Sequence, residues 1–190
     1  MKRKQKRKGA TKQLSGAAAY KRGEYLYYQK GDPDTALKYF KKAAKAGYKK
    51  AYGEIGIILH RENNEPDEAE EWFIKAERSN SLFPAARYEY GMLHYLSKED
   101  WETGLKYLLE SADQEYELAY GDIGSIVYVY QEKIDEAESW FEKAKKAGCL
   151  DAPQAYDYGM LLIEERGEIE EGKKYLKMAE EGGYFDEGFG

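Results

Sequence analysis

The chain has few of the residues on which metal centres, disulfide frameworks and covalent catalysis depend. It holds one cysteine, Cys149, and two histidines, His60 and His94, among its 190 residues. A single cysteine excludes an internal disulfide framework. Two widely separated histidines and one cysteine form neither a metal cluster nor a catalytic Cys–His pair that the sequence supports. We therefore predict no enzymatic activity, no metal and no cofactor.

Long apolar runs are missing as well. No stretch approaches the roughly 20 apolar residues that span a bilayer. The basic start of the chain is not followed by the apolar segment of a secretory signal. We therefore expect a cytoplasmic protein without a membrane partner.

Charge is unevenly distributed along the chain. The segment MKRKQKRKGATK (1–12) holds 7 of the 30 Lys and Arg residues and no acid, so the remainder carries 23 basic and 36 acidic residues, a formal charge of −13. Such a like-charge block is typical of disorder. We predict a basic arm over residues 1–16 that either binds nucleic acid by neutralising phosphates, through residues 1–12 only, or is a solvated tail. As a tail it would aid solubility or fold back on the acidic body.

One phrase recurs along the chain. AYGEIGIILH (51–60) returns as AYGDIGSIVY (119–128), and its central glycine recurs at intervals of 33, 35, 33 and 35 residues. A second small residue always stands 13 positions later. The alternating intervals indicate that the full period is a pair of repeats. The repeat glycines are Gly23, Gly56, Gly91, Gly124 and Gly159, and the second small residues are Ala36, Ala69, Gly104, Ala137 and Gly172.

Each repeat carries two apolar stripes at helical spacing, separated by turn and N-cap residues such as KGDPDT (30–35). The unit is therefore a helix hairpin, and stacked hairpins bury a core that one hairpin cannot. A helical glycine costs roughly 1 kcal/mol relative to alanine, so the recurring glycines predict close packing of the first helix on the second. We predict an all-α superhelical solenoid of five repeats over residues 17–183. The repeats span about 17–49, 50–84, 85–117, 118–152 and 153–183, and an acidic aromatic tail follows at 184–190.

The junction KAAKAGYKKAYGEIG (42–56) resembles that of Sel-one-like repeats, a branch of the tetratricopeptide superfamily. An alanine-rich end of the second helix is followed by a glycine, an alanine and the repeat glycine. The likeness covers nearly the whole chain, although the spacing of 13 residues is closer to the shorter tetratricopeptide loop. The resemblance implies a right-handed superhelix whose first helices line the concave side. It also implies a protein that holds proteins or peptides rather than catalysing a reaction.

Two faces of the first helix can be separated by their offsets from the repeat glycine. Offsets −1, +2 and +3 carry mainly aliphatic residues and are predicted core, whereas offsets −3, +1 and +4 fall on the face that the resemblance places on the concave side. Tyrosine and methionine suit binding surfaces, so we expect a Tyr-rich groove, notched at two glycines, for an extended or helical segment. The predicted partner-binding residues are Tyr20, Tyr27, Gly53, Ile57, His60, Tyr88, Met92, Tyr95, Gly121, Tyr128, Tyr156 and Met160. The same residues could instead be core, with the two glycines serving only close helix contact.

Three functional hypotheses follow. The first is a non-enzymatic scaffold for protein–protein interaction, with an unidentified partner. The second is an immunity protein that neutralises a bacterial toxin, because a small acidic body would suit a basic nuclease. The third is a nucleic-acid-associated protein that acts through the basic arm. The sequence favours the first without excluding the others.

Overall fold

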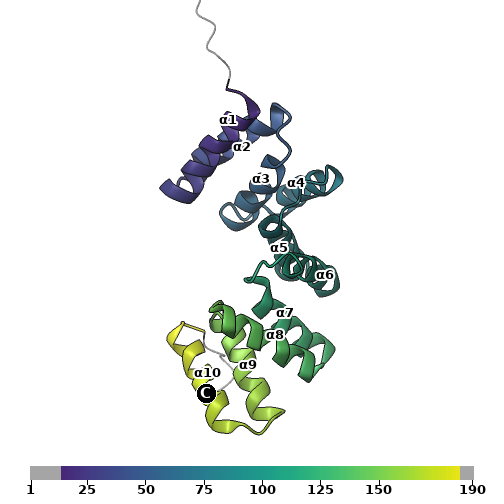
Figure 1. The fold of residues 1–190 in the computed structure, drawn as a ribbon, viewed down its shortest axis with the longest axis vertical. Coiled ribbons are helices and arrows are strands. Elements are labelled where there is room, and N and C mark those ends of the chain that lie inside the picture. The colour runs from purple at the N-terminus through teal and green to yellow at the C-terminus, as the bar shows by residue number, and fades with distance from the viewer. Residues whose placement is uncertain (1–13, 185–190) are drawn as a thin grey trace, which may run out of the picture.

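The computed structural model describes residues 14–184. The basic segment at 1–12 and most of the predicted tail lie outside this range. Within it the chain forms ten α-helices and two π-helical turns, with no strand. These helices form five hairpins stacked in chain order along an elongated, curved array (Figure 1). The prediction of an all-α solenoid of five repeats is confirmed.

Each hairpin consists of a first and a second helix, and π-helical turns end the first helices of the first and third hairpins. No helix in residues 14–184 is long and apolar enough to cross a membrane. The hairpins are α1 (Gly16–Glu24) with η1 (Tyr25–Gln29) and α2 (Pro33–Lys45); α3 (Ala51–Arg61) and α4 (Pro66–Arg78); α5 (Pro84–Met92) with η2 (Leu93–Ser97) and α6 (Trp101–Ala112); α7 (Ala119–Gln131) and α8 (Ile134–Ala147); α9 (Ala152–Glu164) and α10 (Ile169–Glu181).

Local capping explains where several second helices begin. The Asp32 carboxylate accepts a hydrogen bond from the backbone N–H of Thr35 at 3.0 Å and thereby caps α2. Asp100 does the same for α6 through the N–H of Thr103 at 3.1 Å. Such a cap stabilises a helix by about 1 kcal/mol.

All five hairpins turn with the same backbone conformation. Left-handed residues stand 8 and 24 positions after each repeat glycine, with φ between 51° and 82°, and the described residues have no others. Because the turn is the same each time, the spacing of 13 residues between the two small residues does not vary. At the first register they are Gly31, Asn64, Glu99, Glu132 and Gly167, and at the second Gly47, Asn80, Glu115, Gly148 and Gly183.

The repeat glycines allow the two helices of each hairpin to touch. A Cβ added to Gly56 would lie 2.6 Å from the ring of Phe73, and one added to Gly124 would lie 2.8 Å from the ring of Phe141. Both rings are fully buried. The first hairpin has the same glycine-on-phenylalanine contact. The predicted close packing is therefore confirmed.

The third and fifth hairpins reach the same packing in another way. Leucine replaces phenylalanine, the second small residue is also a glycine, and the two backbones approach each other. A Cβ added to Gly91 would lie 3.0 Å from the carbonyl oxygen of Gly104 and 3.0 Å from the Leu108 side chain. Where the second helix has the smaller leucine in place of phenylalanine, a glycine in place of alanine lets the helices approach more closely, so the interior stays densely packed.

The core lies where the periodicity predicts. Residues at offsets −1, +2 and +3 in the second, fourth and fifth hairpins are at most 3% exposed. They are Ile55, Ile58, Leu59, Ile123, Ile126, Val127, Tyr158, Leu161 and Leu162.

Successive hairpins meet in two alternating ways. After the first and third hairpins, the next first helix packs mainly on the preceding second helix, α3 on α2 and α7 on α6. After the second and fourth, first helices also pack on each other, α3 on α5 and α7 on α9. The residue at offset −3 alternates in step: it is Tyr20 or Tyr88 before the former junctions and Gly53 or Gly121 before the latter. The sequence therefore repeats over pairs of hairpins because the packing between successive hairpins alternates between two arrangements.

We expect Gly124→Ala to lower the free energy of unfolding by about 1–3 kcal/mol, because the added Cβ overpacks the contact with Phe141. Intrinsic helix propensity alone predicts the opposite sign, by about 1 kcal/mol. Urea denaturation of Gly124→Ala, Phe141→Leu and the double variant measures the coupling. Additive effects, or a more stable single glycine variant, would contradict the proposed contact.

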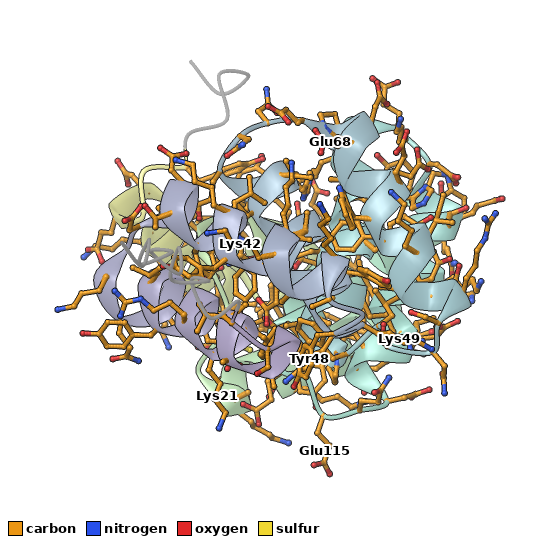
Figure 2. All side chains as sticks on the ribbon, turned by 90° about the horizontal axis from the view of Figure 1, so that it is seen from above. Lys21, Lys42, Tyr48, Lys49, Glu68 and Glu115 are labelled. Atoms are coloured by element: carbon orange, nitrogen blue, oxygen red, sulfur yellow. The ribbon has the colours of Figure 1, made fainter. Side chains whose placement is uncertain are left out.

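Glu115 occupies a left-handed position, with φ of 61°, and projects from the surface (Figure 2). Glycine adopts this conformation without the strain of a Cβ. Glu115→Gly should therefore raise the free energy of unfolding by about 0.5–1 kcal/mol, measured by urea denaturation. Gln114→Gly is the control and should destabilise the protein, since glycine adds backbone entropy to the unfolded chain and the variant loses the hydrogen bond from the Gln114 amide to the Glu110 carbonyl at 3.0 Å.

Candidate functional site

The residue four positions after the repeat glycine reaches from one first helix to the next. The Tyr27 hydroxyl donates to the Glu62 carboxylate at 2.9 Å, and the Tyr128 hydroxyl donates to Glu164 at 3.4 Å. The two tyrosine side chains are half-buried, and the two glutamates are exposed. We call the four residues at this register the inner row: Tyr27, His60, Tyr95 and Tyr128.

The two central members of the inner row make the same kind of link. His60 Nε2 lies 3.5 Å from Ser97 Oγ of the next first helix, and His60 Nδ1 lies 3.2 Å from the Glu89 carboxylate. The ring of Tyr95 meets that of Tyr130 edge-on, with 6.1 Å between centroids. Each of the first four hairpins is thus connected to its successor through the inner row.

An exposed apolar strip borders the inner row. We call its four residues the apolar edge. They lie at offset +5 or +6, at the C-terminal ends of the first helices of the first, third and fourth hairpins, whereas the second hairpin has Arg61 at offset +5. Single exposed residues of this size are unremarkable, and their recurrence at one register makes them a candidate interaction surface. The apolar edge consists of Tyr28 (55% exposed), Leu96 (62%), Val129 (53%) and Tyr130 (46%).

The sequence analysis missed the apolar edge, because it considered only offsets −3, +1 and +4 as the binding face. The signal was present in the sequence: offset +5 is large and apolar in the first, third and fourth hairpins. η1 and η2 carry Tyr28 and Leu96 beside Tyr27 and Tyr95 of the inner row. π-Helical turns are frequent at functional sites, and nothing in the apolar spacing predicts them here.

Two hollows lie near the C-terminal end of α7. Tyr130 stacks on Trp101 of α6, with 5.4 Å between centroids and 18° between planes. A hollow of about 520 Å³ lies on the α6 side and reaches Gln131. A second hollow of about 400 Å³ lies beyond it, lined by Tyr128, Val129, Glu132, Ile134 and Glu165. The inner row and the apolar edge converge between these two hollows.

A ladder of acids lies beneath this surface at offset −2, and the sequence analysis missed it too. Burial raises the pKa of Glu54, whose carboxylate accepts hydrogen bonds from the hydroxyls of Tyr20 at 2.8 Å and Tyr28 at 2.9 Å. Arg61 and His60 meet the buried Glu89 carboxylate in the same way. The four members are Glu54, Glu89, Asp122 and Asp157.

Asp122 bonds to the hairpins on both sides of its own. Its carboxylate accepts hydrogen bonds from the Tyr88 hydroxyl at 2.9 Å and the Gln154 amide at 2.7 Å. Burial raises the pKa of Asp122 to about 6, and these two hydrogen bonds oppose the rise. The ladder therefore joins neighbouring hairpins from inside the packing, and its charges are not presented to a partner.

Four predicted partner-binding residues lie inside the packing. Tyr20 and Ile57 are each 3% exposed. A Cβ on Gly53 would meet the Phe83 ring at 2.7 Å, and one on Gly121 would meet Gln154 at 2.9 Å. The predicted notches are therefore filled by the next hairpin, because these glycines serve close helix contact.

The remaining predicted residues are half-buried. Four of them form the inner row. Met92 packs against the core of the third to fifth hairpins, and Met160 stands at the same register of α9. Tyr88 belongs to the Asp122 junction, and the ring of Tyr156 meets that of Tyr184 at 5.4 Å between centroids.

Because the folded-state pKa of Asp122 lies above its unfolded value of about 3.9, the ionised form costs stability above pH 6. This cost is relieved as the pH falls from 6 towards 4. Asp122→Asn removes the titration. We expect the wild type to gain about 1 kcal/mol in free energy of unfolding relative to this variant between pH 7 and pH 5, measured by urea denaturation. The exposed Asp113→Asn is the control, and an unchanged pH dependence in Asp122→Asn would contradict the assignment.

The comparisons with known proteins concern repeats and fold. Residues 20–80 match the sequence model of the Tetratricopeptide repeat, and residues 126–149 match that of the PPR repeat. No curated protein sequence matches the chain.

Several solved structures share the fold. MamA protein is 22% identical and has a TM-score of 0.63, with 88% of this chain and 91% of that chain covered. PilF of Pseudomonas aeruginosa is 22% identical, with a TM-score of 0.69 and coverage of 90% and 78%. A Sel1 repeat protein from Oxalobacter formigenes is 22% identical, with a TM-score of 0.62 and coverage of 89% and 74%. Residues 20–80 thus match a tetratricopeptide repeat model, and the chain has the helical-repeat fold of these solved structures.

Proposed function

We propose that the chain is a non-enzymatic scaffold that binds a segment of another protein along the inner row and the apolar edge. The observation that carries this proposal is the apolar edge itself. Its four large side chains are each at least 46% exposed and lie at the same end of the first helices of the first, third and fourth hairpins. Exposed apolar residues gathered in this way mark interaction surfaces.

The inner row supplies side chains that are already held in place. Burial raises the pKa of Tyr95 and of Tyr128 to about 12, and the Tyr128 hydroxyl donates to Glu164. Each ring also contacts the following first helix. Tyrosines fixed before binding lose little conformational entropy on contact, which favours affinity.

The end of α7 favours a particular kind of segment. One hollow reaches Gln131 and the other is lined by Tyr128 and Val129, and both offer places for side chains of a partner. Glu132 and Glu165 line one of them, and Glu164 bonds to Tyr128 nearby. We infer a segment with apolar anchors and at least one basic side chain, because the border is acidic.

The chemistry of the described residues supports a role in binding rather than catalysis. The Cys149 thiol donates to the Glu117 carbonyl at 3.1 Å, and burial raises its pKa, which disfavours the reactive thiolate. In residues 14–184, no three His, Cys, Asp or Glu side chains gather as metal ligands.

The test compares two pairs of exposed apolar residues. Leu96→Asp with Val129→Asp places two charges on the apolar edge, and we expect it to weaken partner binding at least about 10-fold. Leu118→Asp with Ile169→Asp is the control, since these side chains are 46% and 51% exposed elsewhere. A partner is first captured with the wild type and identified by mass spectrometry, and calorimetry then measures its affinity for all three proteins. Equal affinities of the two double variants, with helicity retained, would refute the proposed surface.

A further inference from the structure

The first hairpin differs in charge from the rest of the array. Residues 14–50 contain nine Lys and Arg residues and three acids, a net charge of +6. Residues 51–184 contain 14 basic and 31 acidic residues, a net charge of −17. The first hairpin lies at one end of the elongated array (Figure 1), so the molecule has a positive end and a negative body.

Ion pairing sharpens this difference. In residues 51–184, 11 of the 14 basic side chains form ion pairs with acids. In residues 14–50, only Lys41 of nine does so, with Glu68 at 3.0 Å. The positive charge of the first hairpin is therefore almost entirely uncompensated by its own neighbours.

Six of these side chains belong to α2 and to the loop that follows it, and we call them the lysine stripe. Four lie on α2 at a spacing that places them on one helix face, over a rise of about 10 Å, and two follow in the loop to α3. All six are exposed, and Figure 2 looks onto this end of the array, with Lys42 and Lys49 labelled. The lysine stripe consists of Lys38, Lys41, Lys42, Lys45, Lys49 and Lys50.

We propose that the lysine stripe binds the phosphate backbone of a nucleic-acid duplex. Five of the six ammonium groups form no ion pair within residues 14–184, and Lys41 pairs with Glu68. Ammonium groups that neutralise phosphates release counterions, and this release drives sequence-independent binding. The site is separate from the apolar edge and does not depend on the scaffold function.

Other occupants fit the patch less well. Lysine is depleted at protein–protein interfaces. Stable membrane binding is favoured by apolar anchors in addition to basic charge, and residues 33–50 expose no large hydrophobic side chain. A single strand requires a free aromatic face for stacking, whereas the half-buried Tyr39 ring has the Lys42 ammonium 4.7 Å from its centroid.

The lysine stripe extends the interpretation made from the sequence, which confined nucleic-acid contacts to residues 1–12. That segment carries seven further Lys and Arg residues and leads into α1, which packs on α2. The proposal assigns binding to a folded surface rather than to this basic segment, so removing either one has a separate effect.

The repeat provides a matched control. Lys42 and Lys45 stand 19 and 22 positions after Gly23, and Lys143 and Lys146 stand at the same distances from Gly124. All four are exposed and form no ion pair within residues 14–184. Lys42→Gln with Lys45→Gln and Lys143→Gln with Lys146→Gln therefore change net charge equally at the same helical register.

The experiment measures fluorescence anisotropy of a labelled DNA duplex of about 20 base pairs with the full chain, between about 50 and 200 mM salt. For Lys42→Gln with Lys45→Gln, we expect the negative slope of log affinity against log salt to become shallower by about 2, with helicity unchanged. The matched control should keep the wild-type slope.

Several results would overturn the proposal. Equal slopes for the two double variants would show that only net charge matters. Loss of duplex binding on deletion of residues 1–12, with Lys42→Gln and Lys45→Gln without effect, would place the contact in that segment alone. Tighter binding to phosphatidylserine vesicles or to single strands, or salt-sensitive self-association without duplex binding, would assign the patch to another occupant.

Discussion

The contact between the repeat glycine and the second helix of the same hairpin determines the rest of the structure. At Gly56 and Gly124 a phenylalanine ring occupies the space of the missing side chain, and at Gly91 a neighbouring backbone does. This contact brings two helices close enough to bury their small residues, and the uniform left-handed turns keep them in one register. Five hairpins of the same shape can then stack in order, and equivalent side chains line up along the array.

The alignment separates three roles on each first helix. Offsets −1, +2 and +3 form the core, offset −2 places acids inside the junctions, and offsets +4 to +6 form the inner row and the apolar edge. The buried acids are costly to ionise, as the raised pKa of Asp122 shows, and hydrogen bonds from the next hairpin offset part of that cost. Junctions are therefore specific about which neighbour they accept, while the exposed ends of the helices remain open to a partner.

Much of the fold could be predicted from the sequence, because helical periodicity and the recurring glycines report directly on packing. The glycine contacts and the nine core residues follow from spacing alone. The left-handed backbone at Glu115 could not be predicted, since glutamate carries no signal for that conformation. The prediction of open notches at Gly53 and Gly121 was wrong, because a sequence does not show which side chains of the next hairpin pack against a glycine. The acids at offset −2 were missed for the same reason, because an acidic side chain is usually exposed and the sequence does not show the hydrogen-bond donors of the neighbouring hairpin.

Hydrogen exchange of the chain with and without a captured partner tests the central claim most directly, namely that aligned helix ends form the contact surface. The account predicts slower exchange on binding at 25–29, 93–97 and 126–131, where the inner row and the apolar edge lie. Protection confined to the second helices α4, α6, α8 and α10, with these segments unchanged, would contradict it.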